Sequence, residues 1–181
     1  LIRTLTALPA AAFGIASMAP TLSSAASQRP QAAPPRYGAG LRLGALPYRD
    51  VSMPVAVHYP TLVPEQPVDL GPYRMSVAMR APAAQGGPWP VVFVSHGTGG
   101  SVLGHADLAA GLARAGNVVV ALEHPGDNYR DRSLVGDARY FSERPAQLLA
   151  VMRAVLDSEG AAGAAARLLM GDLSIDAKAI A

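Results

Sequence analysis

The chain has 181 residues, of which 50% are hydrophobic and 15% charged, so it is long enough to bury one sizeable core in about one domain. Its 15 Lys and Arg residues against 13 Asp and Glu give a formal charge of +2, and the basic residues are scattered. We therefore expect no nucleic-acid partner. Cysteine is absent, which excludes disulfides, zinc–thiolate sites and a thiol nucleophile within these residues.

Residues 1–26 have the pattern of a secretory signal peptide. Arg3 supplies a basic start, residues 5–19 are almost uncharged and apolar, and Ser24-Ala25-Ala26 provides small residues for cleavage after Ala26. A membrane anchor is the alternative, but prolines and a glycine interrupt the run, which is shorter than the roughly 20 apolar residues of a spanning helix. We expect export, no stable membrane span, and a Pro/Ala-rich linker over 27–45.

The opening part of the predicted domain, which covers residues 46–181, has two strand patterns. Residues 51–59 alternate between larger and smaller side chains, as a half-buried strand does, and Pro60 ends the run. A second alternating stretch, 73–80, follows the turn signal Gly71-Pro72. We expect the two stretches to pair as an antiparallel meander.

The next part of the chain has the order strand, helix, strand. Residues 91–95 and 118–122 are continuous apolar runs, which are typical of parallel strands covered on both faces. Between them, 105–115 is predicted to be a helix with Leu108 and Leu112 one turn apart, ended by Gly116. This order places the two strands side by side and parallel.

The remaining pattern completes an α/β architecture. Ser142 is expected to cap a helix over 142–158 that packs on the sheet through an apolar stripe of Leu148, Leu149, Met152, Val155 and Leu156. The segment after Gly160 fits either a helix or a loop, and 175–181 is predicted to lead into another buried strand. The fold class is α/β, with antiparallel opening strands followed by a doubly wound parallel sheet.

The strongest candidate for chemistry is Ser95-His96-Gly97-Thr98-Gly99-Gly100, at the carboxyl end of a central parallel strand, where open α/β sheets bind ligands. Glycines allow close backbone approach, and outward amide hydrogens, including that of Thr98, can hold the negative oxygen of a tetrahedral intermediate. A plain tight turn explains the glycines equally well. A phosphate-binding loop is less well supported, because neither the Walker nor the dinucleotide spacing is present.

A second candidate segment, Glu123 to Asn128, follows the other parallel strand and therefore lies at the same edge of the sheet. His124, Asp127 and Asn128 are placed to line the same pocket. Asp127 or Asn128 can hydrogen-bond the first loop and keep its amides in place. Ordinary turn chemistry for Pro-Gly-Asp-Asn is the favoured alternative.

A metal site is the third interpretation of the polar residues. His96, His105, Asp107 and His124 are metal-ligating types, but no close histidine pair at helical spacing supports a site, and imidazoles at strand ends are usually satisfied by backbone carbonyls. We expect neither a metal ion nor a cofactor.

The run from Val92 to Arg132, VFVSHGTGGSVLGHADLAAGLARAGNVVVALEHPGDNYRDR, together with VAVHYP and GPYRMSVAMRAP before it, resembles the bacterial predicted dienelactone hydrolase family and, more distantly, the platelet-activating factor acetylhydrolases. The resemblance implies an α/β-hydrolase fold and a Ser, Asp and His triad acting on small-molecule esters. It also implies that the residue after His-Gly, here Thr98, supplies an oxyanion-hole amide, with His96, Gly97 and Gly99 shaping the loop.

The family's nucleophile elbow, Gly-x-Ser-x-Gly, is not present in this chain. Members continue into it from a segment like 176–181, so we expect the nucleophile, the acid and the histidine of the triad to lie beyond Ala181, and this chain to be the N-terminal half of the fold. Ser95 and Ser101 lack the elbow around them. Two functions stay open: a carboxylic ester hydrolase in its complete form, or an inactive remnant or binding module. The oligomeric state is not determined by these residues.

Overall fold

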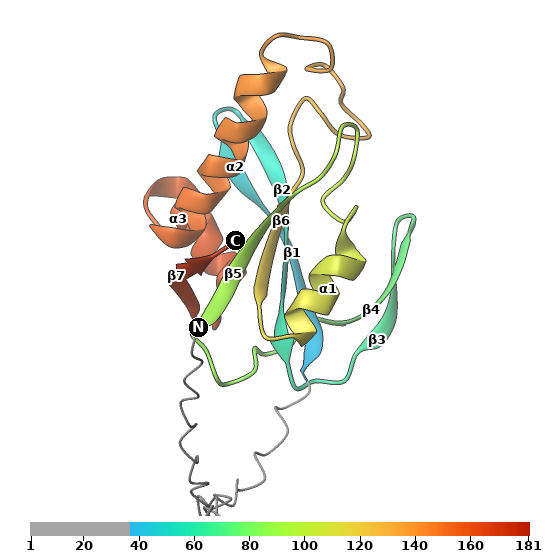
Figure 1. Ribbon diagram of the computed structural model, residues 1–181, viewed down its shortest axis with the longest axis vertical. Coiled ribbons are helices and arrows are strands. Elements are labelled where there is room, and N and C mark those ends of the chain that lie inside the picture. Colours follow the sequence, from blue (N-terminus) through green and yellow to red (C-terminus); the bar gives the residue numbers. More distant parts are fainter. Residues whose placement is uncertain (1–36) are drawn as a thin grey trace, which may run out of the picture. The chain divides into compact units, whose positions relative to one another are not determined.

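The computed structural model describes residues 37–181, so the predicted signal peptide and the first part of the predicted linker lie outside the described residues. Seven strands and three helices make up this part of the chain (Figure 1). The strands are β1 (Gly38–Tyr48), β2 (Val51–Thr61), β3 (Gln66–Leu70), β4 (Tyr73–Met79), β5 (Trp89–Ser95), β6 (Val118–Leu122) and β7 (Ile175–Ile180). The helices are α1 (Ala106–Arg114), α2 (Tyr140–Leu156) and α3 (Gly160–Met170).

The strands form one mixed sheet in the order β3-β4-β1-β2-β6-β5-β7. Strands β6, β5 and β7 run parallel to one another, and β2 pairs antiparallel with β6 and joins these strands to the opening part of the sheet. α1 covers one face of the sheet, whereas α2 and α3 cover the other (Figure 1). Helices on both faces of a sheet whose central strands are parallel confirm the predicted α/β class.

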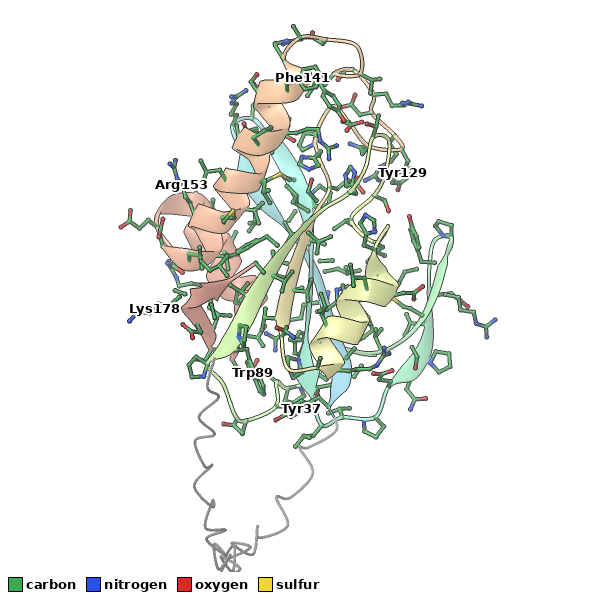
Figure 2. The ribbon with its side chains drawn as sticks, viewed as in Figure 1. Tyr37, Trp89, Tyr129, Phe141, Arg153 and Lys178 are labelled. Carbon is green, nitrogen blue, oxygen red and sulfur yellow. The ribbon has the colours of Figure 1, made fainter. Side chains whose placement is uncertain are left out.

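The two parallel strands predicted from apolar runs are present and adjacent. β5 and β6 pair in register from Val91 opposite Val118 to Ser95 opposite Leu122. Every residue of β6 is buried, as expected for a strand covered on both faces. β5 is less completely covered, because the residues from Val92 to Val94 are only half-buried. At the other end of β5, Trp89 packs edge-on against Tyr37, with ring centroids 5.2 Å apart (Figure 2).

The linker predicted over 27–45 is wrong from Gly38 onward, where β1 begins. β1 pairs along its whole length with β2. The glycines of β1 are typical of a loop, so the sequence did not indicate a strand. Packing requires one of them, because a Cβ at Gly40 would lie 2.4 Å from the Tyr59 ring. The small residue lets the aromatic ring of the neighbouring strand lie across the backbone.

The pairing predicted between 51–59 and 73–80 is also wrong. β4 pairs antiparallel with β3, a short strand that the sequence analysis missed, and touches β1 in parallel at Gly40 and Leu41. β1 lies between β4 and β2 in the sheet, so the two predicted partners are separated by a strand. The error arose because the sequence analysis did not predict β1.

The helices are present, but their buried faces differ from the prediction. α1 ends before Gly116, which has φ of 88°, the left-handed conformation expected after a helix end. Its buried residues are alanines, and Leu108, one of the two leucines one turn apart, is 57% exposed. Small side chains on the buried face let the helix lie close to the sheet, and the larger leucine turns outward.

α2 begins at Tyr140 with Arg139 at its cap position, so capping by Ser142 is wrong. Of the predicted stripe, Val155 is buried and Leu149 is exposed. The buried residues of α2 are Gln147, Val151, Ala154 and Val155. The ambiguous segment after Gly160 is α3, and the strand predicted near the end is β7, which pairs parallel with β5. Within residues 37–181, no helix combines the length and apolar character that crossing a membrane requires.

Candidate functional site

The two polar segments predicted from the sequence meet at one edge of the sheet. The loop 96–100 leaves the carboxyl end of β5, and the segment 123–128 leaves the carboxyl end of β6, its parallel neighbour (Figure 1). Both segments contact residues at the start of α2. The loop after β5 is called the amide loop below.

His96 anchors the amide loop from inside. Its Nε2 accepts a hydrogen bond of 3.0 Å from the backbone N–H of His124, so Nε2 carries no proton. Nδ1 therefore holds the proton of the neutral ring and donates it to the Gly97 carbonyl at 2.7 Å. Burial lowers the pKa of His96, which favours this neutral form. The ring thus joins the amide loop to the segment after β6.

The peptide between Gly97 and Thr98 is held in one orientation. Its carbonyl oxygen accepts hydrogen bonds from His96 Nδ1 and, at 3.0 Å, from the Gly100 N–H. In a trans peptide the N–H points opposite to the carbonyl, so the Thr98 N–H points away from both donors. Thr98 is exposed, and no acceptor for its N–H lies among residues 37–181. The result is a free amide hydrogen on a fixed peptide.

Asp127 holds the other side of the loop. It is fully buried, and its Oδ1 accepts the Gly99 N–H at 2.8 Å. Its Oδ2 accepts a hydrogen bond and ion pair from Arg144 of α2. Burial alone would raise the pKa of Asp127, but the Gly99 amide and the Arg144 guanidinium together keep that pKa below its usual value. Gly99 has φ of 68°, a conformation that favours glycine.

Asp127 and Asn128, which the sequence left as alternatives, have different partners. Asn128 makes a local turn: its side-chain oxygen accepts the backbone N–H groups of Arg130 and Asp131, each at 3.0 Å. Its amide nitrogen donates to the His124 carbonyl at 2.9 Å. The predicted hydrogen bond to the amide loop is therefore confirmed for Asp127, and ordinary turn chemistry describes Asn128.

Arg144 is a site residue that sequence reasoning missed. Besides Asp127, it donates to the His96 carbonyl and, at 3.1 Å, to the Ser95 hydroxyl. Its side chain is largely buried, at 14% exposure. Nothing in the sequence marks it, because a charged residue in the first turns of a helix is ordinarily solvated. Only the packing of α2 brings it to the ends of β5 and β6.

His124 is the centre of a second hydrogen-bond chain. Gln147 donates its amide to the Pro125 carbonyl at 3.0 Å, so its oxygen faces His124 Nδ1 at 2.7 Å and that nitrogen carries the proton. His124 Nε2 then accepts the Ser95 hydroxyl at 2.8 Å. Burial lowers the pKa of His124 to about 4.

The order Ser95, His124, Gln147 matches the order nucleophile, base and orienting group in serine hydrolases. Two properties argue against that chemistry. A histidine with a pKa of about 4 is a weak base, and a neutral Gln147 cannot stabilise the imidazolium ion as a carboxylate does. We therefore interpret this chain of hydrogen bonds as a support for the strand ends and the amide loop.

The residues of metal-ligating type named from the sequence, His96, His105, Asp107 and His124, do not form a common site. Across residues 37–181, no group of three or more His, Cys, Asp or Glu side chains is arranged to hold a metal ion. His96 and His124 form a T-shaped pair with centroids 5.0 Å apart, and both nitrogens of each ring are already engaged by protein groups.

Comparisons with known proteins agree with this fold. Residues 66–150 match the family model of platelet-activating factor acetylhydrolase, isoform II. Among solved structures, a ferulic acid esterase from Streptomyces cinnamoneus is similar with a TM-score of 0.61 and 22% identity, covering 82% of this chain and 52% of that protein. The chain thus spans about half the length of this structural relative. No curated protein sequence matches the chain significantly.

The predicted likeness to the platelet-activating factor acetylhydrolases is confirmed over the matched residues, which include the amide loop and the segment after β6. The predicted α/β-hydrolase fold is confirmed by the structural relative. The likeness to dienelactone hydrolases stays a prediction. The chain therefore has an α/β-hydrolase-like fold, and over residues 66–150 it is similar to the platelet-activating factor acetylhydrolase family.

Proposed function

We propose that this chain is part of a longer serine hydrolase that cleaves carboxylic esters, and that the amide loop forms half of its oxyanion hole. The observation that carries the proposal is the unpartnered N–H of the exposed residue Thr98, on a peptide fixed by His96 and Gly100. Both proteins named in the comparisons are ester-cleaving enzymes by their descriptions. The proposal places the triad outside this chain, in agreement with the absence of an elbow motif from its sequence.

The chemistry follows from the position of that amide. A serine outside this chain attacks the ester carbonyl, its proton passes to the triad histidine, and the carbonyl oxygen becomes negatively charged. The Thr98 N–H and a second amide from the part of the proposed enzyme outside this chain donate to this oxygen. The alcohol then leaves with the proton, and water releases the acid from the acyl-serine. This chain's own residues hold one donor ready and move no proton.

Two supports keep that donor in place before the substrate arrives. His96 and Gly100 hold the Gly97 carbonyl on one side of Thr98, and Asp127 holds the Gly99 amide on the other. An amide already oriented needs no reorganisation when charge develops, which is where such donors gain their effect. Asp127 and His96 are positioning residues in this proposal.

The test compares two changes at one position in the complete protein. Thr98→Ala keeps the N–H, and its hydroxyl partner Tyr140 is 2.6 Å away at the surface, so turnover of p-nitrophenyl acetate should stay within a few-fold. Thr98→Pro removes the N–H and should lower kcat by about a hundredfold or more. Circular dichroism and thermal melting establish that both variants fold. Equal losses from two folded variants would contradict the amide assignment.

We also propose that the protein is exported, with cleavage after Ala26. The support is the basic start, the apolar run and the small residues within 1–26. A small extracellular or periplasmic ester would then be within the enzyme's reach without transport into the cell.

A further inference from the structure

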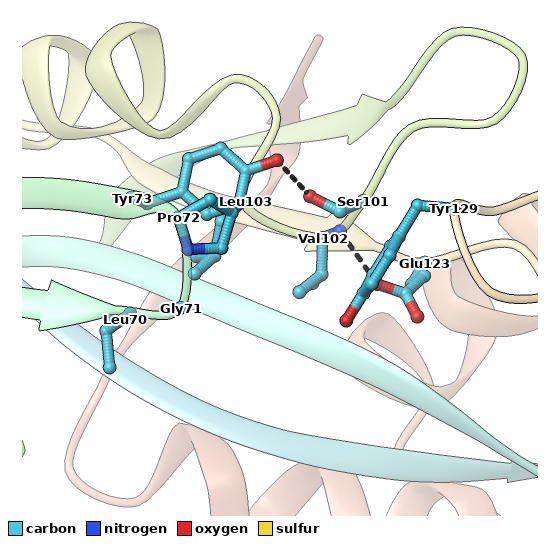
Figure 3. Close-up of a pocket in the computed structure, with 9 residues that line it drawn as sticks. All are labelled: Leu70, Gly71, Pro72, Tyr73, Ser101, Val102, Leu103, Glu123 and Tyr129. Atoms are coloured by element: carbon cyan, nitrogen blue, oxygen red, sulfur yellow. Dashed lines mark hydrogen bonds between the residues drawn. The ribbon is translucent and has the colours of Figure 1, made fainter.

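A cavity of about 420 Å³ lies beside the amide loop. It is bounded by the turn between β3 and β4 (residues 70–73), by residues 101–103 after the amide loop, and by Glu123 and Tyr129 (Figure 3). Small-molecule sites have volumes of about 300–1,000 Å³, mostly apolar walls and a few placed polar groups. This cavity has the size and the lining of such a site.

Two tyrosine side chains form opposite walls of the cavity. Tyr73 lies on one side of the cavity, with its hydroxyl directed at Ser101, and Tyr129 lies on the other side (Figure 3). Tyr129 is 61% exposed although it is a large aromatic residue, and the Arg130 guanidinium lies 5.0 Å from its ring centroid on the ring face. Rings packed against rings are favourable beyond the area they bury. The walls therefore suit a flat ring.

The polar groups in the cavity suit a neutral hydrogen-bond donor. Glu123 is buried, and its two carboxylate oxygens accept one hydrogen bond each, from the Val102 N–H at 3.2 Å and from Arg130 at 2.9 Å. A carboxylate has about four acceptor positions, so acceptor capacity is left over. A second anion beside Glu123 would be repelled, whereas a hydroxyl group can donate to it.

The cavity is connected to the amide loop by the chain itself. Ser101, whose hydroxyl is 2.6 Å from the Tyr73 hydroxyl, lies three residues after Thr98, so their Cα atoms are at most about 10 Å apart. The Tyr129 N–H donates to the Gly100 carbonyl at 3.0 Å, which holds this wall against the loop. The cavity wall and Thr98 are therefore separated by no more than about the length of a small molecule.

We propose that this cavity binds an uncharged phenolic ring, with the ring between Tyr73 and Tyr129 and the phenol hydroxyl donating to Glu123. The inference rests on the proposed function in one respect: the ring would be one arm of the ester whose carbonyl meets Thr98. The ring site itself requires only residues of this chain.

The experiment follows backbone amides of the ¹⁵N-labelled full chain by NMR while 4-ethylphenol is added. The Val102 and Tyr129 amides should shift and saturate with a dissociation constant in the roughly millimolar range that nine heavy atoms support. 4-Ethylanisole, which keeps the ring but cannot donate, should bind about fivefold more weakly or worse. Benzoate should give no saturable shift at these amides.

Matched variants separate the ring site from other aromatic surfaces. Tyr129→Ala removes an exposed wall and should weaken 4-ethylphenol binding by about tenfold. Phe141→Ala truncates an aromatic residue that is 82% exposed and lies outside the cavity, and it should leave the affinity unchanged. Equal affinity for 4-ethylphenol and 4-ethylanisole, or full affinity in Tyr129→Ala, would overturn the proposal.

The experiments distinguish a failure of the ring site from a failure of the proposed ester hydrolase function. Ring binding is measured without any ester. Saturable shifts in this chain, together with no ester turnover by the complete protein, would leave the ring site standing and refute the proposed function. Ester turnover by the complete protein with no shift at Val102 or Tyr129 would refute the ring site alone.

Discussion

His58 is a buried histidine with no hydrogen-bond partner for either ring nitrogen, and it is the only side chain with such buried, unsatisfied atoms in the described part of the chain. It lies on β2, on the same face as Ala56, which packs under α1. Burial, with a smaller effect from Arg114, lowers its pKa from 6.5 to about 4. Folding therefore requires the neutral ring.

The pH dependence follows from that difference. Between pH 6.5 and pH 4 the unfolded chain binds a proton at this histidine and the folded chain does not, so stability present above pH 6.5 is lost as the pH falls. From pH 7.5 to pH 5, His58 alone should lower the free energy of unfolding by about 2 kcal/mol. At pH 7.5 its unpartnered nitrogens carry a further penalty of about 1–3 kcal/mol.

His58→Leu tests both quantities, because leucine has a similar volume and no polar atoms. Urea unfolding at pH 7.5 should show a gain in stability of about 1–3 kcal/mol. The loss between pH 7.5 and pH 5 should shrink by about 2 kcal/mol, while the part due to His124, whose pKa is also lowered to about 4, should remain. His105→Leu, at an exposed histidine, is the matched control. A less stable His58→Leu protein with an unchanged pH dependence would refute the reasoning.

Three other predictions concern the amide loop and the start of the chain. Asp127→Asn leaves Arg144 without its carboxylate in a buried place and should lower the free energy of unfolding by about 3 kcal/mol in urea, whereas Asp137→Asn, at an exposed pair, should have a much smaller effect. Ser95→Ala should leave ester turnover of the complete protein within a few-fold and its labelling by a fluorophosphonate intact, and abolished labelling would identify Ser95 as the nucleophile. N-terminal sequencing of exported protein should begin at Ser27, and an intact Leu1 would contradict cleavage.

The parallel half of the fold could be predicted because its signals are local. The apolar runs of β5 and β6 and the glycine at 116 are each visible within a few residues. β1 could not be predicted, because its glycines indicate a loop until the Tyr59 ring is known to cross Gly40. Arg42 covers the same ring, 4.5 Å from its centroid, so the polar residue in this strand also depends on a tertiary contact.

Part of the candidate site could likewise be predicted from local signals, and part of it could not. The amide loop and Asp127 were found because both follow strands whose ends meet, which topology alone dictates. Arg144 and Gln147 were missed because the docking of α2 brings them from elsewhere in the sequence. Gln147 did leave a signal: it lies four residues before Val151 on the buried face of α2, where a polar side chain requires a partner.

The uncharged side chain at position 147 is consistent with His124 serving as a support for the amide loop and not as a catalytic base. A carboxylate in that position would stabilise a positively charged His124 and raise its pKa, but a protonated ring could no longer accept the Ser95 hydroxyl. Protonation of His96 is equally disruptive, because a proton on Nε2 would face the His124 N–H. Burial keeps both rings neutral, and an uncharged Gln147 does not offset burial at His124 as a carboxylate would. A neutral His96 is what holds the Gly97 carbonyl, and with it the Thr98 amide, in its orientation. The orientation of the proposed oxyanion donor is therefore linked to the same low pKa values that make these histidines poor bases.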